Sequence, residues 1–162
     1  MATLLELETT GELVRLDPEL GPREMEDRRI FLLPRAREQI ERDIAVLEST
    51  WQVEISPIEQ LDALVHRFCT GQPLSINTQF RCLNHLGEGV WELKTGDLRL
   101  FGWFPLRDCF ICCDCISADL VKVSDLYYGL CRQVAWYRDK LNLDDPKFLS
   151  GTDPNVVVSN WC

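Results

Sequence analysis

In this chain of 162 residues we recognise no secretory signal and no membrane-spanning segment. Its first residues, MATLLELETTGELVRL, have no basic start, and Glu6 interrupts them before an apolar run develops. No stretch approaches the roughly 18 consecutive apolar residues that span a membrane. We therefore expect a soluble, cytoplasmic protein with no membrane contact, and the length fits one domain with a substantial core.

Positive charge is also scarce, and this argues against nucleic-acid binding by the chain as a whole. There are 17 basic and 26 acidic residues, which gives a net charge of −9. Residues 1–50 carry twelve acids against seven bases, whereas residues 91–162 carry ten against eight. Because a polyanion repels phosphate, we expect no direct DNA binding. A local basic patch in the C-terminal half remains open.

Cysteine, in contrast, is abundant: four of the eight cysteines fall in the segment 109–115, CFICCDC. Without a secretory signal we expect thiols rather than disulfides. A structural zinc site takes two cysteine pairs that lie well apart, and here the second pair is missing. Cys109 and Cys112 have CxxC spacing, but in a predicted strand rather than at a helix N-terminus, where a thiolate is stabilised. We predict no metal and no cofactor, and interpret these cysteines as small core residues; zinc or redox chemistry is the weaker alternative.

The N-terminal half combines one strand with two helices. Residues 1–27 are predicted to be an extension, as a short hairpin or an arm, with a turn-rich break at 17–22. Residues 28–33 form an apolar strand, and Pro34 opens a helix that runs to about residue 50. Ser56, Pro57 and Glu59 begin a second helix, which ends at Gly71. The two helices are expected to form an antiparallel hairpin, joined around residues 52–55.

The C-terminal half is predicted to be mainly strands. Residues 90–95, 98–104 and 109–116 are strands joined by short turns, which gives an antiparallel meander. Ser124 is expected to cap a last helix over 125–141, and residues 143–162 form a tail. The fold class is therefore α+β: a small antiparallel sheet, made of the meander and the N-terminal strand, with the helical hairpin and the last helix on one face.

Strand alternation assigns side chains to faces. Arg99, Phe101 and Trp103 are predicted to share one face, and Leu98, Leu100 and Phe104 the other. In the cysteine strand the two predicted sets are Cys109, Ile111, Cys113 and Cys115, and Phe110, Cys112, Asp114 and Ile116. The Arg99 face would then offer a cation beside flat rings, on which single-stranded RNA stacks.

Residues 87–123, GEGVWELKTGDLRLFGWFPLRDCFICCDCISADLVKV, and the helix after them resemble the RelE/HigB superfamily of bacterial and phage toxins. The similarity is closest to the phage-derived, HigB-like branch. VWELK at 90–94 matches a first strand motif, with Lys94 in the usual Arg place, and LRLF at 98–101 matches a second. With the preceding strand and helices, the resemblance covers residues 28–142, which we take as the toxin-like domain between extension and tail.

The resemblance implies the toxin of a type II toxin–antitoxin system, a metal-independent mRNA endoribonuclease that acts on the ribosome or alone. In this chemistry a ribose 2′-OH attacks the adjacent phosphate, so the site needs a proton acceptor, cations and a donor for the leaving oxygen. The implied catalytic residues are Arg99 for the phosphate, Lys94 and Lys122 for added charge, Tyr127 and Tyr128 for proton transfer or stacking, and His85 as a base. Phe101 and Trp103 are the implied RNA-stacking residues.

The sequence departs from the family pattern, and the departures keep a second function open. The basic turn that usually precedes the last helix is ADLVK here, with Lys122 alone where two cations are common. Arg99 also has the simpler option of an ion pair with Glu92 across the hairpin. The alternative is a catalytically inactive relative that binds a protein, such as a phage or prophage accessory protein. Its sheet aromatics, Trp91, Phe101, Trp103 and Phe104, would be the anchors. The partner expected of the toxin is a cognate antitoxin, with mRNA or the ribosome as its target.

Overall fold

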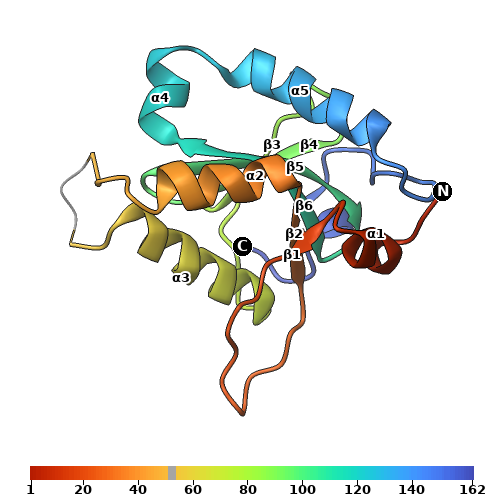
Figure 1. The fold of residues 1–162 in the computed structure, drawn as a ribbon, viewed down its shortest axis with the longest axis horizontal. Coiled ribbons are helices and arrows are strands. Elements are labelled where there is room, and N and C mark those ends of the chain that lie inside the picture. Colours follow the sequence, from red (N-terminus) through yellow and green to blue (C-terminus); the bar gives the residue numbers. More distant parts are fainter. Residues whose placement is uncertain (51–53) are drawn as a thin grey trace.

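A six-stranded mixed sheet forms the centre of the computed structural model, which describes residues 1–50 and 54–162 (Figure 1). The strand order is β1-β2-β6-β5-β4-β3. Strands β4, β5 and β6 pair antiparallel in sequence order, as the meander prediction required, and β2 pairs with β6 in parallel. The strands are β1 (Val14–Arg15), β2 (Arg29–Leu32), β3 (Phe80–Cys82), β4 (Val90–Lys94), β5 (Leu98–Leu106) and β6 (Cys109–Ser117).

The α+β class is confirmed, but the predicted sheet is corrected in two ways. It gains edge strands β1 and β3, and it is mixed rather than antiparallel because β2 and β6 run the same way. Strands of two and three residues are too short for an alternation pattern to reveal. Their pairing partners lie in other parts of the sequence, so tertiary contacts and not local pattern decide them.

Helices cover both faces of the sheet, where one covered face was predicted. Figure 1 shows α2 (Pro34–Gln39) and α3 (Pro57–Cys69) on one side and α4 (Ala118–Val123) and α5 (Tyr127–Lys140) on the other. The physical reason lies in β5, whose Leu100 and Phe104 face one layer while Phe101 and Trp103 face the other. A strand that is apolar on both faces needs cover on both. No helix in the described ranges is long and apolar enough to cross a membrane.

The helical hairpin follows its local signals, with one correction. Pro34 opens α2, but the helix passes into a π-helix, η1 (Ile40–Ile44), and ends there rather than near residue 50. For α3 the signals hold: the Ser56 hydroxyl accepts a hydrogen bond from the Glu59 amide, and Gly71 follows the helix with a φ of 75°. The predicted connection at 52–55 lies partly outside the described residues.

The segment before the last helix also differs from the prediction. Ser117, not Ser124, begins a helix there: its hydroxyl accepts from the Leu120 amide and caps α4. Ser124 ends α4, and α5 begins three residues later at Tyr127 without a side-chain cap. What was expected to be a basic turn is therefore a short helix, which carries Lys122 in its last turn.

A β-bulge in β6 changes the face assignment of its second half. The pairing register with β5 shifts between Phe101 and Gly102, which leaves Cys113 as the extra residue opposite that step. Alternation holds before the bulge, with Cys109, Ile111 and Cys113 packed towards α5. After it, Cys115 packs towards α2 and α3, opposite to the prediction, because an extra residue reverses the two-residue period.

The two ends of the chain pack onto this frame. Residues 1–27 contribute α1 (Leu4–Thr10) and β1, with Leu7 and Leu13 buried on the α5 side. The tail contributes α6 (Pro154–Val157), and its Val157 and Val158 are buried on the α3 side. Both segments thus share the core of the sheet.

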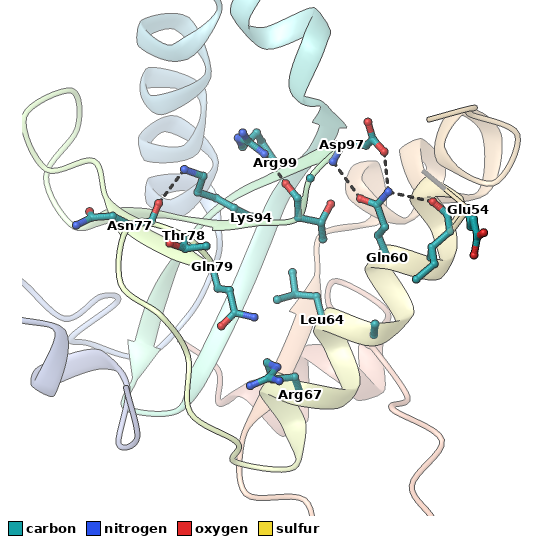
Figure 2. A pocket seen from close by; sticks show the side chains of 14 residues that line it. Glu54, Gln60, Leu64, Arg67, Asn77, Thr78, Gln79, Lys94, Asp97 and Arg99 are labelled. Atoms are coloured by element: carbon teal, nitrogen blue, oxygen red, sulfur yellow. Dashed lines mark hydrogen bonds between the residues drawn. The ribbon is translucent and has the colours of Figure 1, made fainter. Parts of the chain in front are cut away.

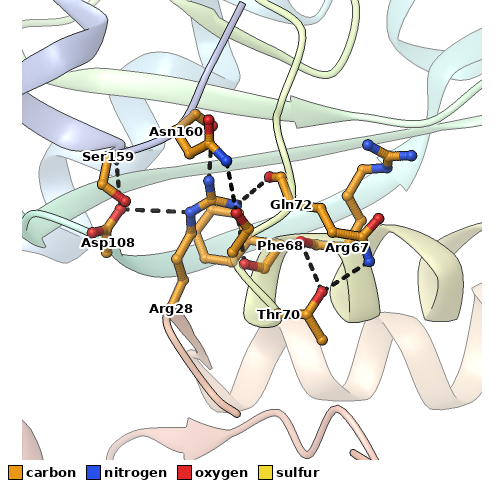
Figure 3. Close-up of polar contacts among 9 residues, drawn as sticks. Arg28, Arg67, Phe68, Thr70, Gln72, Asp108, Ser159 and Asn160 are labelled. Atoms are coloured by element: carbon orange, nitrogen blue, oxygen red, sulfur yellow. Dashed lines mark hydrogen bonds and ion pairs between the residues drawn. The ribbon is translucent and has the colours of Figure 1, made fainter. Parts of the chain in front are cut away.

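Arg28, at the entrance to β2, ties the tail to α3 (Figure 3). Its guanidinium donates to the carbonyls of Phe68 (3.1 Å), Gln72 (2.9 Å) and Asn160 (2.8 Å), and its Nε lies 3.5 Å from the Asp108 carboxylate. Only 1% of Arg28 is exposed. A charge this deeply buried is tolerated because carbonyls and a carboxylate surround it.

Candidate functional site

The cysteine segment that dominates the sequence is structural. All four cysteines of β6 are buried and unpaired by disulfides, in agreement with their interpretation as core residues. Burial raises the pKa of the Cys109 and Cys115 thiols to about 12, so they carry almost no thiolate at neutral pH. Within residues 1–50 and 54–162 there is no group of three or more potential metal ligands.

Cations gather where the β4–β5 hairpin turns. Lys94 and Arg99 face each other across the two strands, and Arg81 on β3 faces Glu92 on β4. Side chains of directly paired residues share a face, so these strands place three cations around Glu92. Lys122 of α4 adds a fourth, close enough for its charge to lower the pKa of Lys94. We call Arg81, Glu92, Lys94, Arg99 and Lys122 the hairpin cluster.

Arg99 is the central cation of the hairpin cluster and is only 6% exposed. Its Nη1 donates to two carbonyls of its own turn, Thr95 (2.6 Å) and Leu98 (2.8 Å). Its Nε has no hydrogen-bond partner, and no salt bridge to Arg99 is formed within the described part of the chain. A buried, incompletely paired guanidinium is poised to bind an anion.

Glu92 pairs with Arg81, which the sequence did not predict, and not with Arg99, which was the alternative considered. Glu92 is fully buried, and its Oε1 lies 2.8 Å from Nη2 of Arg81. The Arg81 guanidinium also lies over the Tyr127 ring, 5.3 Å from its centroid. Arg81 thus neutralises Glu92 and leaves the charges of Lys94 and Arg99 uncompensated inside the hairpin cluster.

The pKa values of Lys94 in the cluster and of Tyr127 beside it are shifted in opposite directions. Burial lowers the pKa of Lys94, and the charge of Arg99 lowers it further; Nζ is held by the Asn77 carbonyl at 3.0 Å. Burial raises the pKa of Tyr127, and the charge of Glu92 adds to this effect. Lys94 therefore loses a proton more readily than a free lysine, while Tyr127 keeps its proton more firmly.

Beside the cluster lies an open pocket of about 1160 Å³, which we call the hairpin pocket (Figure 2). Lys94 and Arg99 line it at the hairpin turn, and Arg67 of α3 lines it on the far side. Tyr127 packs against Phe101 on the face of β5 that Arg99 shares, whereas Leu64 of α3 lines the pocket from the other face of the sheet. The volume of the pocket lies just above the range of about 300–1,000 Å³ that is usual for small-ligand sites.

The structure brings together four of the site residues that the sequence predicted, Lys94, Arg99, Lys122 and Tyr127, but leaves the others apart. His85 is exposed in the loop before β4, at the end of that strand opposite to Lys94. Tyr128 faces outward, where its hydroxyl accepts from Arg132 (3.2 Å). Neither residue contacts the hairpin cluster within the described residues.

The predicted stacking face is wrong. Phe101 and Trp103 do share a face with Arg99, as alternation required, but both are 0% exposed beneath α5. Trp91 and Phe104 are also buried, on the α3 side. The prediction failed because alternation identifies a face without telling what covers it. These rings contribute to the core and offer no surface to RNA or to a partner.

Arg81 and Arg67 were missed, and Glu92 was considered only as a partner of Arg99. Arg81 and Glu92 meet only through the pairing of β3 with β4, and β3 carries no sequence signal of its own. Arg67 lies on the polar side of α3 and is typical of a solvated helix face by its spacing. Comparisons of the chain with protein-family models, with curated proteins and with solved structures give no match.

Proposed function

We propose that the hairpin cluster binds a phosphodiester of single-stranded RNA, and that the chain is a metal-independent endoribonuclease toxin acting on mRNA in the cytoplasm. One observation carries the proposal. A protein with a net charge of −9 places four cations, Arg81, Lys94, Arg99 and Lys122, around a single acid at one corner of its sheet. Concentrated positive charge beside a pocket is what phosphate recognition requires.

The order of elements supports the family resemblance on which the toxin assignment rests. Strand β2, the helices α2 and α3, the meander β4–β5–β6 and α5 follow one another as the resemblance implies. VWELK forms β4, LRLF begins β5, and the cysteine segment forms β6. The sequence motifs and the cation cluster thus meet on the same hairpin.

In this proposal Lys94, Arg99, Lys122 and Tyr127 each take part in the cleavage. Lys94 in its neutral form accepts the proton of the ribose 2′-OH, and its lowered pKa favours that form. The 2′-oxygen forms a bond to phosphorus while the bond to the 5′-oxygen breaks. Arg99 and Lys122 hold the charge of the five-coordinate phosphorus. Tyr127 gives its proton to the departing 5′-oxygen, and its raised pKa keeps that proton available.

Expression in a bacterial host tests this proposal. Induction of the wild-type chain is expected to slow growth and to cleave mRNA, and Arg99→Ala is expected to relieve both effects. Arg107→Ala is the matched control, because Arg107 is an exposed cation in the β5–β6 turn with no salt bridge among the described residues. A wild-type chain that is harmless and cleaves no RNA in the presence of ribosomes contradicts the nuclease.

A second candidate function, a catalytically inactive module that binds a protein, has an observation of its own. The outer faces of α4 and α5 expose Leu120, Val123, Tyr128 and Trp136, each more than half exposed. Arg132 lies over Tyr128 and Lys140 over Trp136, which gives α5 a stripe of alternating rings and cations. Exposed rings of this kind are common anchors of protein interfaces.

The toxin and the binding module share the expectation of a protein partner but differ in what the partner does. For the toxin the partner is a cognate antitoxin that silences RNA cleavage. For the binding module the partner is the target, and the isolated chain cleaves nothing. Co-purification from the native host followed by an RNA cleavage assay on the separated chain decides between them. Recovery of the chain alone under gentle conditions argues against both partner assignments.

A further inference from the structure

Asp97 lies in the turn between β4 and β5, and it is only 4% exposed. Its Oδ2 accepts hydrogen bonds from the Ser49 hydroxyl and from Nε2 of Gln60, both at 2.6 Å. Its Oδ1 accepts from the Thr50 amide at 3.3 Å. Gln60 also accepts in return, because its Oε1 lies 3.0 Å from the Asp97 amide (Figure 2). The side chain of Asp97 therefore connects the hairpin turn to α3 and to residues 49–50.

The backbone of Asp97 connects the same turn to α4. Its carbonyl accepts a hydrogen bond from the amide of Ala118, the first residue of that helix, at 2.8 Å. Helix α4 carries Lys122 in its last turn. The position of Lys122 relative to the hairpin turn thus depends on Asp97 as well.

The turn that contains Asp97 also orients the guanidinium of Arg99. Arg99 donates to the carbonyls of Thr95 and Leu98, which lie on the two sides of the turn (Figure 2). These two residues are bonded to each other, since the Leu98 amide donates to Oγ1 of Thr95 at 3.0 Å and the Thr95 amide donates to the Leu98 carbonyl at 3.1 Å. A displaced turn would therefore displace both carbonyls and the guanidinium with them.

The hairpin cluster needs such support because its cations repel one another. Burial lowers the pKa of Lys94, and the charges of Arg99, Arg81 and Lys122 lower it further. The hydrogen bonds of Asp97 come from α3 and the segment before it, whereas Arg99 shares its face of β5 with Phe101 beneath α5. Asp97 can thus hold the turn in place without occupying the face on which a phosphate would bind.

We infer that Asp97 is a positioning residue, which fixes the hairpin turn so that Arg99 stays at a set place beside Lys122 and can bind a phosphate. The inference rests on the proposed function. Asp97 does not touch the substrate in this account, because its carboxylate is buried and is occupied by Ser49, Thr50 and Gln60. Its effect on binding and cleavage passes through Arg99.

Asp97→Asn tests the inference by the sign of its effect. The amide keeps the size of the side chain but replaces one acceptor oxygen with a donor, so part of the network is lost. It also removes a negative charge near Arg99, which by itself would tighten phosphate binding. Positioning predicts the opposite. A dinucleoside monophosphate with a 2′-O-methyl group, which cannot be cleaved, should bind about fivefold more weakly, and cleavage of mRNA should slow by roughly ten- to a hundredfold.

Two further variants separate positioning from a general loss of stability. Gln60→Ala removes both bonds to Asp97 without a change of charge and should weaken binding of the probe in the same direction, even if Asp97→Asn does not fold. Asp108→Asn is the matched control. Asp108 lies in the turn at the other end of β5, where its Oδ1 accepts from the Ser159 amide at 2.8 Å. It should lower stability in urea denaturation but leave the affinity for the probe unchanged.

A double variant shows whether Asp97 acts through Arg99. In an Arg99→Ala background, Asp97→Asn should weaken probe binding by less than about twofold, because the positioned residue is gone. A loss that persists in this background, or an Asp97→Asn variant that binds the probe as tightly as the wild type or more tightly, overturns the positioning role and leaves the phosphate site at Arg99 intact. A wild-type chain that does not bind the probe, or binds it no better than Arg99→Ala, overturns the proposed function together with the inference.

Discussion

Arg28 and Arg99 are both buried arginines, and their surroundings differ in what they leave unpaired. Arg28 is 1% exposed and bonds to carbonyls of two segments that are far apart in sequence, residues 68–72 and residue 160, with Asp108 as its counter-ion. Arg99 is 6% exposed, and within residues 1–50 and 54–162 its hydrogen bonds go to carbonyls of its own turn. Its neighbours Lys94 and Arg81 are cations.

The comparison separates a charge that holds the fold together from a charge that is available to a ligand. The contacts of Arg28 join the start of β2 to α3, to the tail and to the β5–β6 turn, so its role is complete within the chain (Figure 3). The hydrogen bonds of Arg99 in the described part of the chain stay within the hairpin turn, and Arg99 lines a pocket (Figure 2). Burial alone therefore does not identify a functional arginine, whereas uncompensated charge beside a pocket does.

The largest expected effect is the loss of stability in Arg28→Ala. Arg28→Ala removes the counter-ion of Asp108 and leaves buried carbonyls without donors, so it is expected to lower the free energy of unfolding by about 3–5 kcal/mol. Urea denaturation measures this loss. Arg23→Ala, which removes an exposed arginine, is the control and should change stability by less than about 0.5 kcal/mol. A loss below about 1 kcal/mol for Arg28→Ala contradicts the structural role.

Arg99→Ala should show the opposite profile. We expect cleavage to slow by roughly a hundredfold, about 3 kcal/mol of transition-state stabilisation, because the lost charge acts on the five-coordinate phosphorus. The free energy of unfolding should fall by less than half as much as in Arg28→Ala, since only local hydrogen bonds are lost. Single-turnover kinetics and urea denaturation on the same preparations give both numbers. A large loss of stability with unchanged cleavage would reverse the two assignments.

The pH dependence of cleavage tests whether Lys94, beside Arg99, is the proton acceptor. Lys94 acts in its neutral form, so the rate should rise with pH as Lys94 loses its proton, with a midpoint below that of a free lysine. Lys122→Ala removes a nearby positive charge that favours the neutral form, and therefore should move the midpoint to higher pH. Rate profiles of the two proteins measure the shift. A midpoint that moves down, or not at all, contradicts Lys94 as the proton acceptor.

The smallest effect concerns the thiol beside Arg28. Burial raises the pKa of Cys69 to about 11, and the charge of Arg28 only partly opposes this. At pH 8 about one Cys69 in a thousand is then a thiolate, so a thiol reagent should modify the exposed Cys162 first and spare Cys69. In Arg28→Ala the tail loosens and Cys69 should become reactive, whereas in Arg99→Ala it should stay protected. Mass spectrometry after timed labelling identifies the modified cysteine.

The sequence predicted the features that depend on residues close together in the chain. The caps at Ser56 and Gly71 and the β4–β5 hairpin are local, and all were predicted correctly. The pairing of Lys94 with Arg99 came with the hairpin, because a tight turn fixes its register. Two of the five residues of the hairpin cluster, Lys94 and Arg99, therefore followed from the hairpin alone.

The rest depends on contacts between distant segments. Strand β3, which supplies Arg81, forms only because β4 offers it an edge. Helix α5 packs over Phe101 and Trp103. These two residues, predicted to stack on RNA, therefore lie in the core. The bulge at Cys113 reversed the faces of β6, and alternation contains no signal for an extra residue. Such features are decided by tertiary structure, and local propensity does not report them.

The ends of the cleaved RNA test the central claim most directly. Purified chain is incubated with an mRNA and translating ribosomes, and the new ends are identified by enzymatic labelling. Attack by the 2′-OH under the charge of Arg99 predicts a 2′,3′-cyclic phosphate on the upstream fragment and a 5′-hydroxyl on the downstream one, both absent with Arg99→Ala. Fragments that end in a 3′-hydroxyl and a 5′-phosphate, or the same fragments with Arg99→Ala, would contradict the account.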